Sequence, residues 1–195
     1  MVTNVLPALR GLMAKNNVLP RLVRINATGK APVVAIPAGC ADVVGELRRQ
    51  LPAGATCVTI EGVGTFEAEF SKPTGRAAGK IAVVTGAAQG FGFEIATDLA
   101  MQGAWVALAD INADGLKAAA TKVNAACGRP AALGVAVNVA DVDSLKAALE
   151  QVVGMFGGVD LFVANAGVLR AGSVKELSVK DLDFVTNVNY KGYFL

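Results

Sequence analysis

A glycine-rich turn between an apolar strand and a helix constrains the fold of this chain more than any other feature. Residues 81–84 are apolar throughout and mostly β-branched, which predicts a strand with both faces buried. Residues 85–92 follow with repeated glycines, and apolar side chains then recur at helical spacing at Ile95, Ala96 and Leu99. The order of strand, glycine turn and helix predicts one unit of a doubly wound, parallel α/β sheet.

The glycine turn and the segment after it have the residues that a dinucleotide site needs. Glycines permit unusual backbone angles and let a pyrophosphate approach the main chain, while free N–H groups at the helix start attract its charge. Residues 104–109 predict a second strand. Asp110 follows that strand, about 20 residues beyond the turn, where an acid can accept hydrogen bonds from a ribose. A turn with a purely structural role is the alternative.

Three more helices and two more strands continue the pattern. Asn112, Asp141 and Ser178 are suited to cap the helices, because their side chains can accept a hydrogen bond from a free N–H group. Residues 131–139 and 159–164 predict the third and fourth strands, and right-handed crossovers give the strand order 3-2-1-4. The side chains expected to point inward are Leu116, Ala120 and Val123, then Leu145, Leu149, Val152 and Phe156, then Leu182 and Val185.

Four motifs in order resemble the classical short-chain dehydrogenase/reductase family. Thr85 precedes glycines spaced Gly-x-x-x-Gly-x-Gly, and Asn138-Val139 follows the third strand. Asn165-Ala166-Gly167 follows the fourth strand, and residues 188–195 are similar to the family's Val-Asn-x-x-Gly-x-Phe segment. The resemblance covers about residues 78–195 and implies a Rossmann-type fold and a nicotinamide cofactor.

The cofactor expected from the residues is NAD, because a 2′-phosphate would meet a like charge at Asp110. By resemblance, Asn138 contacts the adenine amino group and Val139 lines the adenine pocket. The same resemblance makes Asn189 a catalytic residue that holds a water in a proton relay. No metal site is expected. The residues expected to bind the cofactor are Gly86, Gln89, Gly90, Phe91, Gly92, Asp110, Ile111, Asn138, Val139, Asn165, Ala166, Gly167 and Val188.

The family's proton-transfer residues have no counterpart in this chain. The reaction uses a serine and a Tyr-x-x-x-Lys pair, in which the lysine lowers the tyrosine pKa. Tyr190 is followed directly by Lys191, and the chain reaches Leu195 without a lysine four residues after Tyr193. The resemblance therefore implies a C-terminally truncated member whose sheet is incomplete on that side.

Residues 1–78 form an N-terminal extension and linker outside this pattern, and residues 79–195 form the Rossmann domain. The extension is expected to be a small α/β unit, faintly similar to linker segments of proteins that fuse a class II aldolase-like domain to a short-chain dehydrogenase. Its linker is residues 71–79. The expected elements are helices at residues 5–13 and 42–51, the first interrupted by Pro7, an apolar run at 31–37 and a strand at 56–60.

Composition narrows the possible functions of the 195-residue chain. It contains no histidine, which excludes Ser-His-Asp triads and Cys-His dyads. A hydrophobic content of 53% without an apolar run of membrane-spanning length favours a globular protein that does not cross a membrane. A net charge of only +2 disfavours binding to nucleic acid or to a membrane surface. Cys40, Cys57 and Cys127 are widely spaced, which predicts free buried thiols and a cytoplasmic location.

Two functions stay open at this point. The first is an NAD-dependent oxidoreductase that acts on a hydroxyl or carbonyl group of a small molecule, such as a sugar or polyol, and whose full-length form is a homo-oligomer. The second is a catalytically inactive nucleotide-binding or interaction module. Methyl transfer from S-adenosylmethionine is disfavoured, because Thr85 precedes the glycines and residues 165–167 have no role in that reaction.

Overall fold

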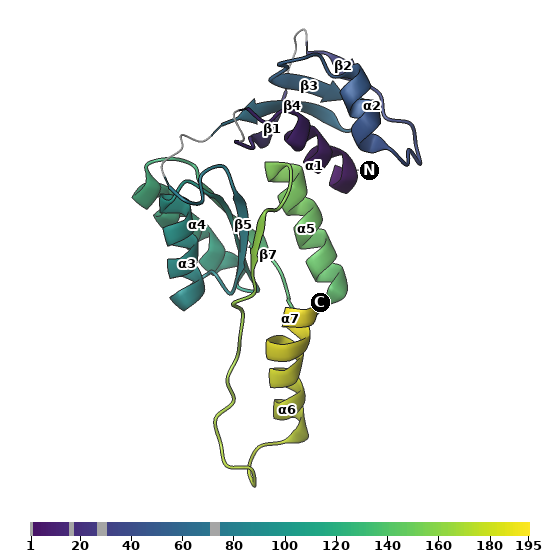
Figure 1. Ribbon diagram of the computed structural model, residues 1–195. Coiled ribbons are helices and arrows are strands. Elements are labelled where there is room, and N and C mark those ends of the chain that lie inside the picture. The colour runs from purple at the N-terminus through teal and green to yellow at the C-terminus, as the bar shows by residue number, and fades with distance from the viewer. Residues whose placement is uncertain (1, 16–17, 27–30, 71–74) are drawn as a thin grey trace. The chain divides into compact units, whose positions relative to one another are not determined.

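The computed structural model describes residues 2–15, 18–26, 31–70 and 75–195 (Figure 1). Residues 71–74 of the predicted linker lie outside the described residues. The chain forms two compact units, and the predicted domain boundary after residue 78 stays a prediction. Unit 1 comprises Met1–Ile81, Gln102–Trp105 and Glu150–Leu161, and unit 2 comprises Ala82–Met101, Val106–Leu149 and Phe162–Leu195. No helix among the described residues is long and apolar enough to cross a membrane.

Unit 1 contains a four-stranded sheet with the order β1-β4-β3-β2. Strand β4 pairs antiparallel with β1 and β3, and β2 pairs parallel with β3. The sequence predicts both helices and β3, but it misses β1 and β4. The elements before residue 71 are α1 (Val2–Leu12), β1 (Arg21–Ile25), β2 (Val33–Val34), α2 (Val43–Gln50), β3 (Cys57–Ile60) and β4 (Gly64–Glu69).

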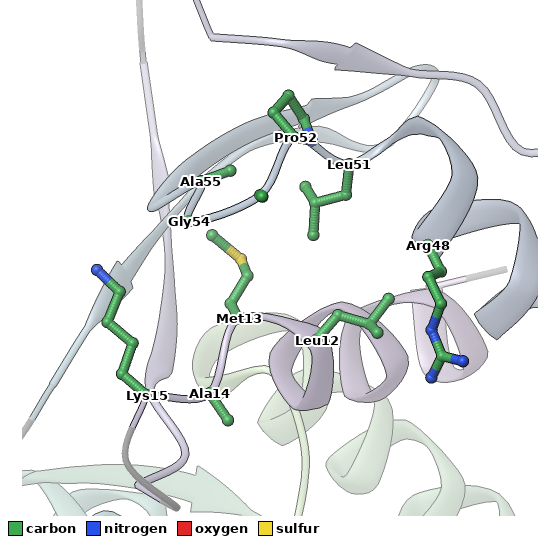
Figure 2. Close-up of a pocket in the computed structure, with 10 residues that line it drawn as sticks. Leu12, Met13, Ala14, Lys15, Arg48, Leu51, Pro52, Gly54 and Ala55 are labelled. Carbon is green, nitrogen blue, oxygen red and sulfur yellow. The ribbon is translucent and has the colours of Figure 1, made fainter.

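A hollow of about 290 Å³ lies between the C-terminal ends of α1 and α2. Met13 and Leu51 point into its middle, and Lys15 and Arg48 stand on opposite sides of it (Figure 2). Arg48 lies in the last turn of α2, and Lys15 follows α1. Helix C-termini favour positive charge. The end of α2 therefore accounts for Arg48, and Lys15 lies over the Phe70 ring, with 5.5 Å between its Nζ and the ring centre.

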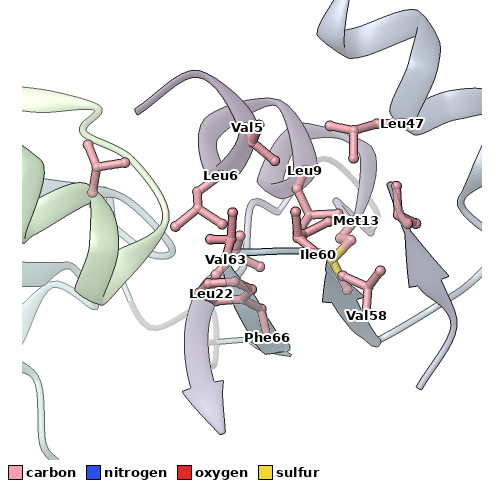
Figure 3. Packing of buried hydrophobic residues seen from close by; sticks show 12 residues of the cluster. Val5, Leu6, Leu9, Met13, Leu22, Leu47, Val58, Ile60, Val63 and Phe66 are labelled. Carbon is pink, nitrogen blue, oxygen red and sulfur yellow. The ribbon is translucent and has the colours of Figure 1, made fainter. Parts of the chain in front are cut away.

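The apolar core of unit 1 lies between α1 and its sheet (Figure 3). Pro7 lies inside α1 and does not interrupt it, contrary to the sequence expectation, because the apolar residues on both sides of the proline are buried in this core. Asp42 caps α2 by accepting a hydrogen bond from Gly45 N. The buried core residues are Val5, Leu6, Leu9, Met13, Leu22, Val34, Leu47, Val58, Ile60, Val63, Phe66 and Val153.

A buried arginine joins three stretches of unit 1 that are distant in sequence. The Arg10 guanidinium donates two hydrogen bonds to the Asp160 carboxylate, at 2.8 and 2.7 Å. It also donates to the carbonyl oxygens of Pro20 and Gly79, at 2.6 and 2.9 Å. Asp160 Oδ2 accepts a further hydrogen bond of 2.7 Å from Ile81 N, at the start of the strand that leads to the glycine turn. Helix α1 is thus attached to both ends of the segment 79–160.

The second sheet has the order β7-β6-β5-β8, which is the predicted order of third, second, first and fourth strands. Strands β6 and β7 are parallel, with Val106 opposite Ala132. Strands β7 and β8 are the two edge strands of this sheet, and Phe162 on β8 is 48% exposed. The elements are β5 (Ile81–Thr85), α3 (Gly90–Met101), β6 (Trp105–Asp110), α4 (Ala113–Cys127), β7 (Ala132–Ala136), α5 (Val142–Phe156), β8 (Leu161–Val163), α6 (Val179–Thr186), η1 (Asn187–Lys191) and α7 (Gly192–Phe194).

The predicted helix caps are confirmed, and most of the inward faces are too. Asn112, Asp141 and Ser178 each accept a hydrogen bond from a backbone N–H group three residues later. Leu116, Val123, Leu145, Val152 and Phe156 are buried as expected.

Four of the nine expected inward positions are not buried. Helix α4 buries Ala119 where Ala120 was expected, and α5 buries Ala148 and Val153 while Leu149 is 37% exposed. Neither of the two positions expected inside on α6 is buried: Leu182 is 65% exposed, and Val185 is half-buried. The three cysteines are free, as predicted. Each of them is half-buried, however, whereas the sequence predicts buried thiols.

Candidate functional site

A hollow of about 650 Å³ lies in unit 2, at the carboxyl ends of β5, β6 and β8. This volume lies within the usual range for small-molecule sites. All of the residues expected to bind the cofactor line it, whereas Asn189 does not. Sequence reasoning missed further lining residues because they belong to no motif: Val137, Ala140, Val168, Phe184 and Asn187.

Two glycines of the turn are required by close backbone approach. Gly86 has a φ of +67°, and a Cβ there would lie 2.9 Å from the Cα of Ala166. A Cβ at Gly92 would collide with the carbonyl oxygen of Gly86 and lie 2.6 Å from Asn165 Nδ2. At Gly90, by contrast, a Cβ would meet nothing within 4 Å. The main chain at Gly90 is therefore open to the hollow, as the approach of a ligand requires.

The start of α3 faces the same hollow through Gly90, Phe91 and Gly92. Free N–H groups and the positive end of the helix dipole favour an anion at this place. The first turn of α3 contains no acidic residue that would oppose it. Phe91 and Ile111 also line the hollow and are 85% and 73% exposed, so they offer apolar surface to a flat ring.

Thr85 holds the turn after β8 against the end of β5. Its side chain is buried, and Oγ1 accepts hydrogen bonds of 3.0 Å from both Asn165 N and Ala166 N. Asn165 returns a hydrogen bond of 3.0 Å from Nδ2 to the carbonyl oxygen of Thr85. In the sequence, Thr85 is recognisable only as the residue that precedes the glycines. Its structural role shows only when the ends of both strands are placed side by side.

Asp110 is fixed beside the glycine turn by both oxygens of its carboxylate. Oδ2 accepts a hydrogen bond of 3.0 Å from Ala88 N, and Oδ1 accepts one of 2.9 Å from Asn112 N. The side chain is half-buried and lines the hollow. A carboxylate oxygen has two lone pairs, so each oxygen retains one acceptor site.

Asn138 and Val139 line the hollow from the segment that follows β7. Asn138 Oδ1 accepts a hydrogen bond of 3.0 Å from Ala140 N, so the oxygen predicted to meet an adenine amino group already has one local partner. A Cβ at Gly192 would lie 3.0 Å from Val139 Cγ2. The contact requires a glycine in α7 and places the last helical segment against this wall.

Asn189 clamps the segment that follows β8. Its Nδ2 donates a hydrogen bond of 2.8 Å to the carbonyl oxygen of Val168, and its Oδ1 accepts one of 2.8 Å from Val168 N. Both polar groups of the side chain therefore hold Val168. The predicted role in a proton relay stays a prediction.

Comparison with known proteins decides the family. The family described as short chain dehydrogenase matches residues 80–195. The chain belongs to the short-chain dehydrogenase family. D-threitol dehydrogenase of Mycolicibacterium smegmatis is 43% identical over 117 residues, which are 60% of this chain and 44% of that protein.

Solved structures of this family have the same fold. A 3-ketoacyl-(acyl-carrier-protein) reductase from Brucella melitensis, complexed with NADH, has 32% identity and a TM-score of 0.56, covering 60% of this chain and 47% of that one. A short-chain dehydrogenase/reductase from Burkholderia phymatum, in complex with NAD, has 34% identity and a TM-score of 0.57, covering 60% and 41%. The chain spans less than half the length of these three relatives.

Proposed function

We propose that the hollow binds NAD and that the chain supplies the cofactor site of an oxidoreductase acting on a hydroxyl or carbonyl group of a small molecule. The pyrophosphate would lie at Gly90, where the main chain is open and the helix dipole favours an anion. The adenosine ribose would bind Asp110, and its adenine would lie against Ile111 and Val139. The two family structures complexed with NADH and NAD support a nicotinamide cofactor.

The fixed carboxylate of Asp110 is the observation on which the choice of NAD over NADP depends. It can accept hydrogen bonds from ribose hydroxyls, whereas a 2′-phosphate there would meet a like charge. Residues 86–92 contain no lysine or arginine that could offset this repulsion.

A polyol or sugar is the substrate class that we propose, because D-threitol dehydrogenase is a relative with 43% identity. Asn189 would serve the catalytic centre by holding Val168, and the serine and Tyr-x-x-x-Lys pair would have to be supplied from outside residues 1–195. A cytoplasmic location and homo-oligomerisation of a full-length form belong to the same proposal.

Replacing Asp110 by alanine should weaken NAD binding by about 1–3 kcal/mol, because hydrogen bonds to a charged group are lost. NADP binding should weaken less or improve, since the repulsion disappears as well. Asp114→Ala is the matched control, because it removes the same charge from an exposed position that does not line the hollow. Calorimetric titration of both variants with both cofactors measures the effect. Equal losses for NAD and NADP in the Asp110 variant would contradict the role of this carboxylate.

A further inference from the structure

An arginine outside the family motifs lies against one wall of the cofactor hollow. Arg170 is in the segment between β8 and α6, two residues after the clamped Val168. Its guanidinium carbon lies 4.5 Å from the centre of the Phe184 ring, a distance typical of cation–π stacking. Phe184 lines the hollow together with Asn187. The contact therefore joins the segment after β8 to the residue of α6 that lines the hollow.

The cap of α6 places a carboxylate oxygen beside the arginine. Ser178 N and Oγ donate hydrogen bonds of 3.1 and 2.6 Å to Asp181 Oδ2, which leaves Asp181 Oδ1 to face Arg170 Nε at 3.6 Å. The Ser178 hydrogen bonds, with a smaller contribution from Arg170, keep the pKa of Asp181 below its ordinary value. Asp181 and Phe184 are three residues apart and so lie on one side of the helix. A single guanidinium can thus contact both.

Phe184 is only partly packed. It is 38% exposed, and α6 buries none of its residues, so packing restrains the rotamer of this ring less than that of a buried one. A ring held flat against the hollow offers apolar surface to a ligand ring, whereas a ring turned toward solvent does not. Orientation of Phe184 therefore decides whether α6 forms a wall of the site.

We propose that Arg170 is a positioning residue that holds Phe184 as the α6 wall of the cofactor hollow. The inference depends on the proposed binding of NAD. It adds Arg170 and Phe184 to the residues that determine the affinity of the chain for NAD. Arg170 acts through Phe184 and does not itself line the hollow.

A double-mutant cycle on the 195-residue chain tests this inference, with NAD affinity measured by calorimetric titration. Arg170→Ala and Phe184→Ala should each weaken NAD binding about two- to fivefold. Arg170→Ala should have no further effect in the Phe184→Ala background, and Arg170→Lys, which keeps a cation over the ring, should bind better than Arg170→Ala. Lys180→Ala, which removes an exposed positive charge from the same helix, should leave the affinity unchanged.

Thermal unfolding of the same variants separates positioning from folding. The proposal expects the affinity to fall while the unfolding temperature of Arg170→Ala stays close to that of the wild-type chain. Additive losses in the double variant, or an unchanged affinity in Arg170→Ala, would overturn the positioning role and leave the proposed function intact. A wild-type chain that does not bind NAD would overturn both.

Discussion

Replacing Arg10 by alanine is expected to lower the free energy of unfolding by about 3–5 kcal/mol, because the change leaves the Asp160 carboxylate without its buried partner. The two side chains are only 5% and 15% exposed. The loss is a large fraction of the roughly 5–15 kcal/mol that stabilises a typical domain. Urea unfolding followed by circular dichroism measures it. A loss below about 1 kcal/mol would show that water replaces the guanidinium and that the pair is not essential.

Two further variants sharpen this test. Arg49→Ala is the matched control, since Arg49 is 69% exposed and pairs with Glu46 within α2. It should change stability little, as exposed ion pairs usually do. Asp160→Asn should destabilise in the same direction as Arg10→Ala, because the Arg10 charge is then left buried without a carboxylate.

The Arg10–Asp160 pair also sets an acid limit to stability. Burial opposes the charge of Asp160, but hydrogen bonds from Arg10 and Ile81 N outweigh it, so the pKa of Asp160 lies below its ordinary value. A carboxyl whose pKa is lowered by folding contributes stability above its unfolded pKa, about 3.9, and this contribution is lost as the pH falls through the folded value. Wild-type stability should therefore drop below about pH 4, and Asp160→Asn should lack this part of the drop.

The 195-residue chain should bind NAD and yet show no NAD-linked turnover. Positioned acid–base groups typically accelerate a reaction by about 10²- to 10⁴-fold, and hydride transfer from an alcohol needs such a group for its proton. Tyr190 and Tyr193 are 73% and 75% exposed and do not line the hollow, so neither replaces the missing tyrosine.

NADH formation with a panel of polyols, including D-threitol, measures this directly. Tyr190→Phe and Tyr193→Phe serve as controls and should leave the result unchanged. Steady turnover of the wild-type chain, abolished in either tyrosine variant, would contradict the expectation and identify a different proton donor.

The glycine turn and Asp110 could be predicted because their signals are local. A strand, a turn and an acid follow one another within about 30 residues, and each residue type has one dominant physical reason to be there. The strand order followed from the handedness of the crossovers. The capping residues were equally local, since each acts on an N–H group three residues away.

The features that sequence reasoning missed depend on contacts between distant residues. Strand β1 has arginines at Arg21 and Arg24, and β4 has glutamates, so neither shows the apolar run expected of a strand; their pairing stabilises both. Arg10 and Asp160 are separated by 150 positions, and nothing near either residue indicates the other. Leu182 was expected inside because its spacing was helical, but periodicity does not show whether another layer covers the helix.

Titration of the wild-type chain with NAD and NADP under identical conditions is the most direct test of the proposed site. Because Asp110 lies fixed beside the glycine turn, we expect saturable binding of one NAD per chain and weaker binding of NADP. Binding of NADP more tightly than NAD would contradict the role of Asp110, and absence of binding by either cofactor would contradict the site itself.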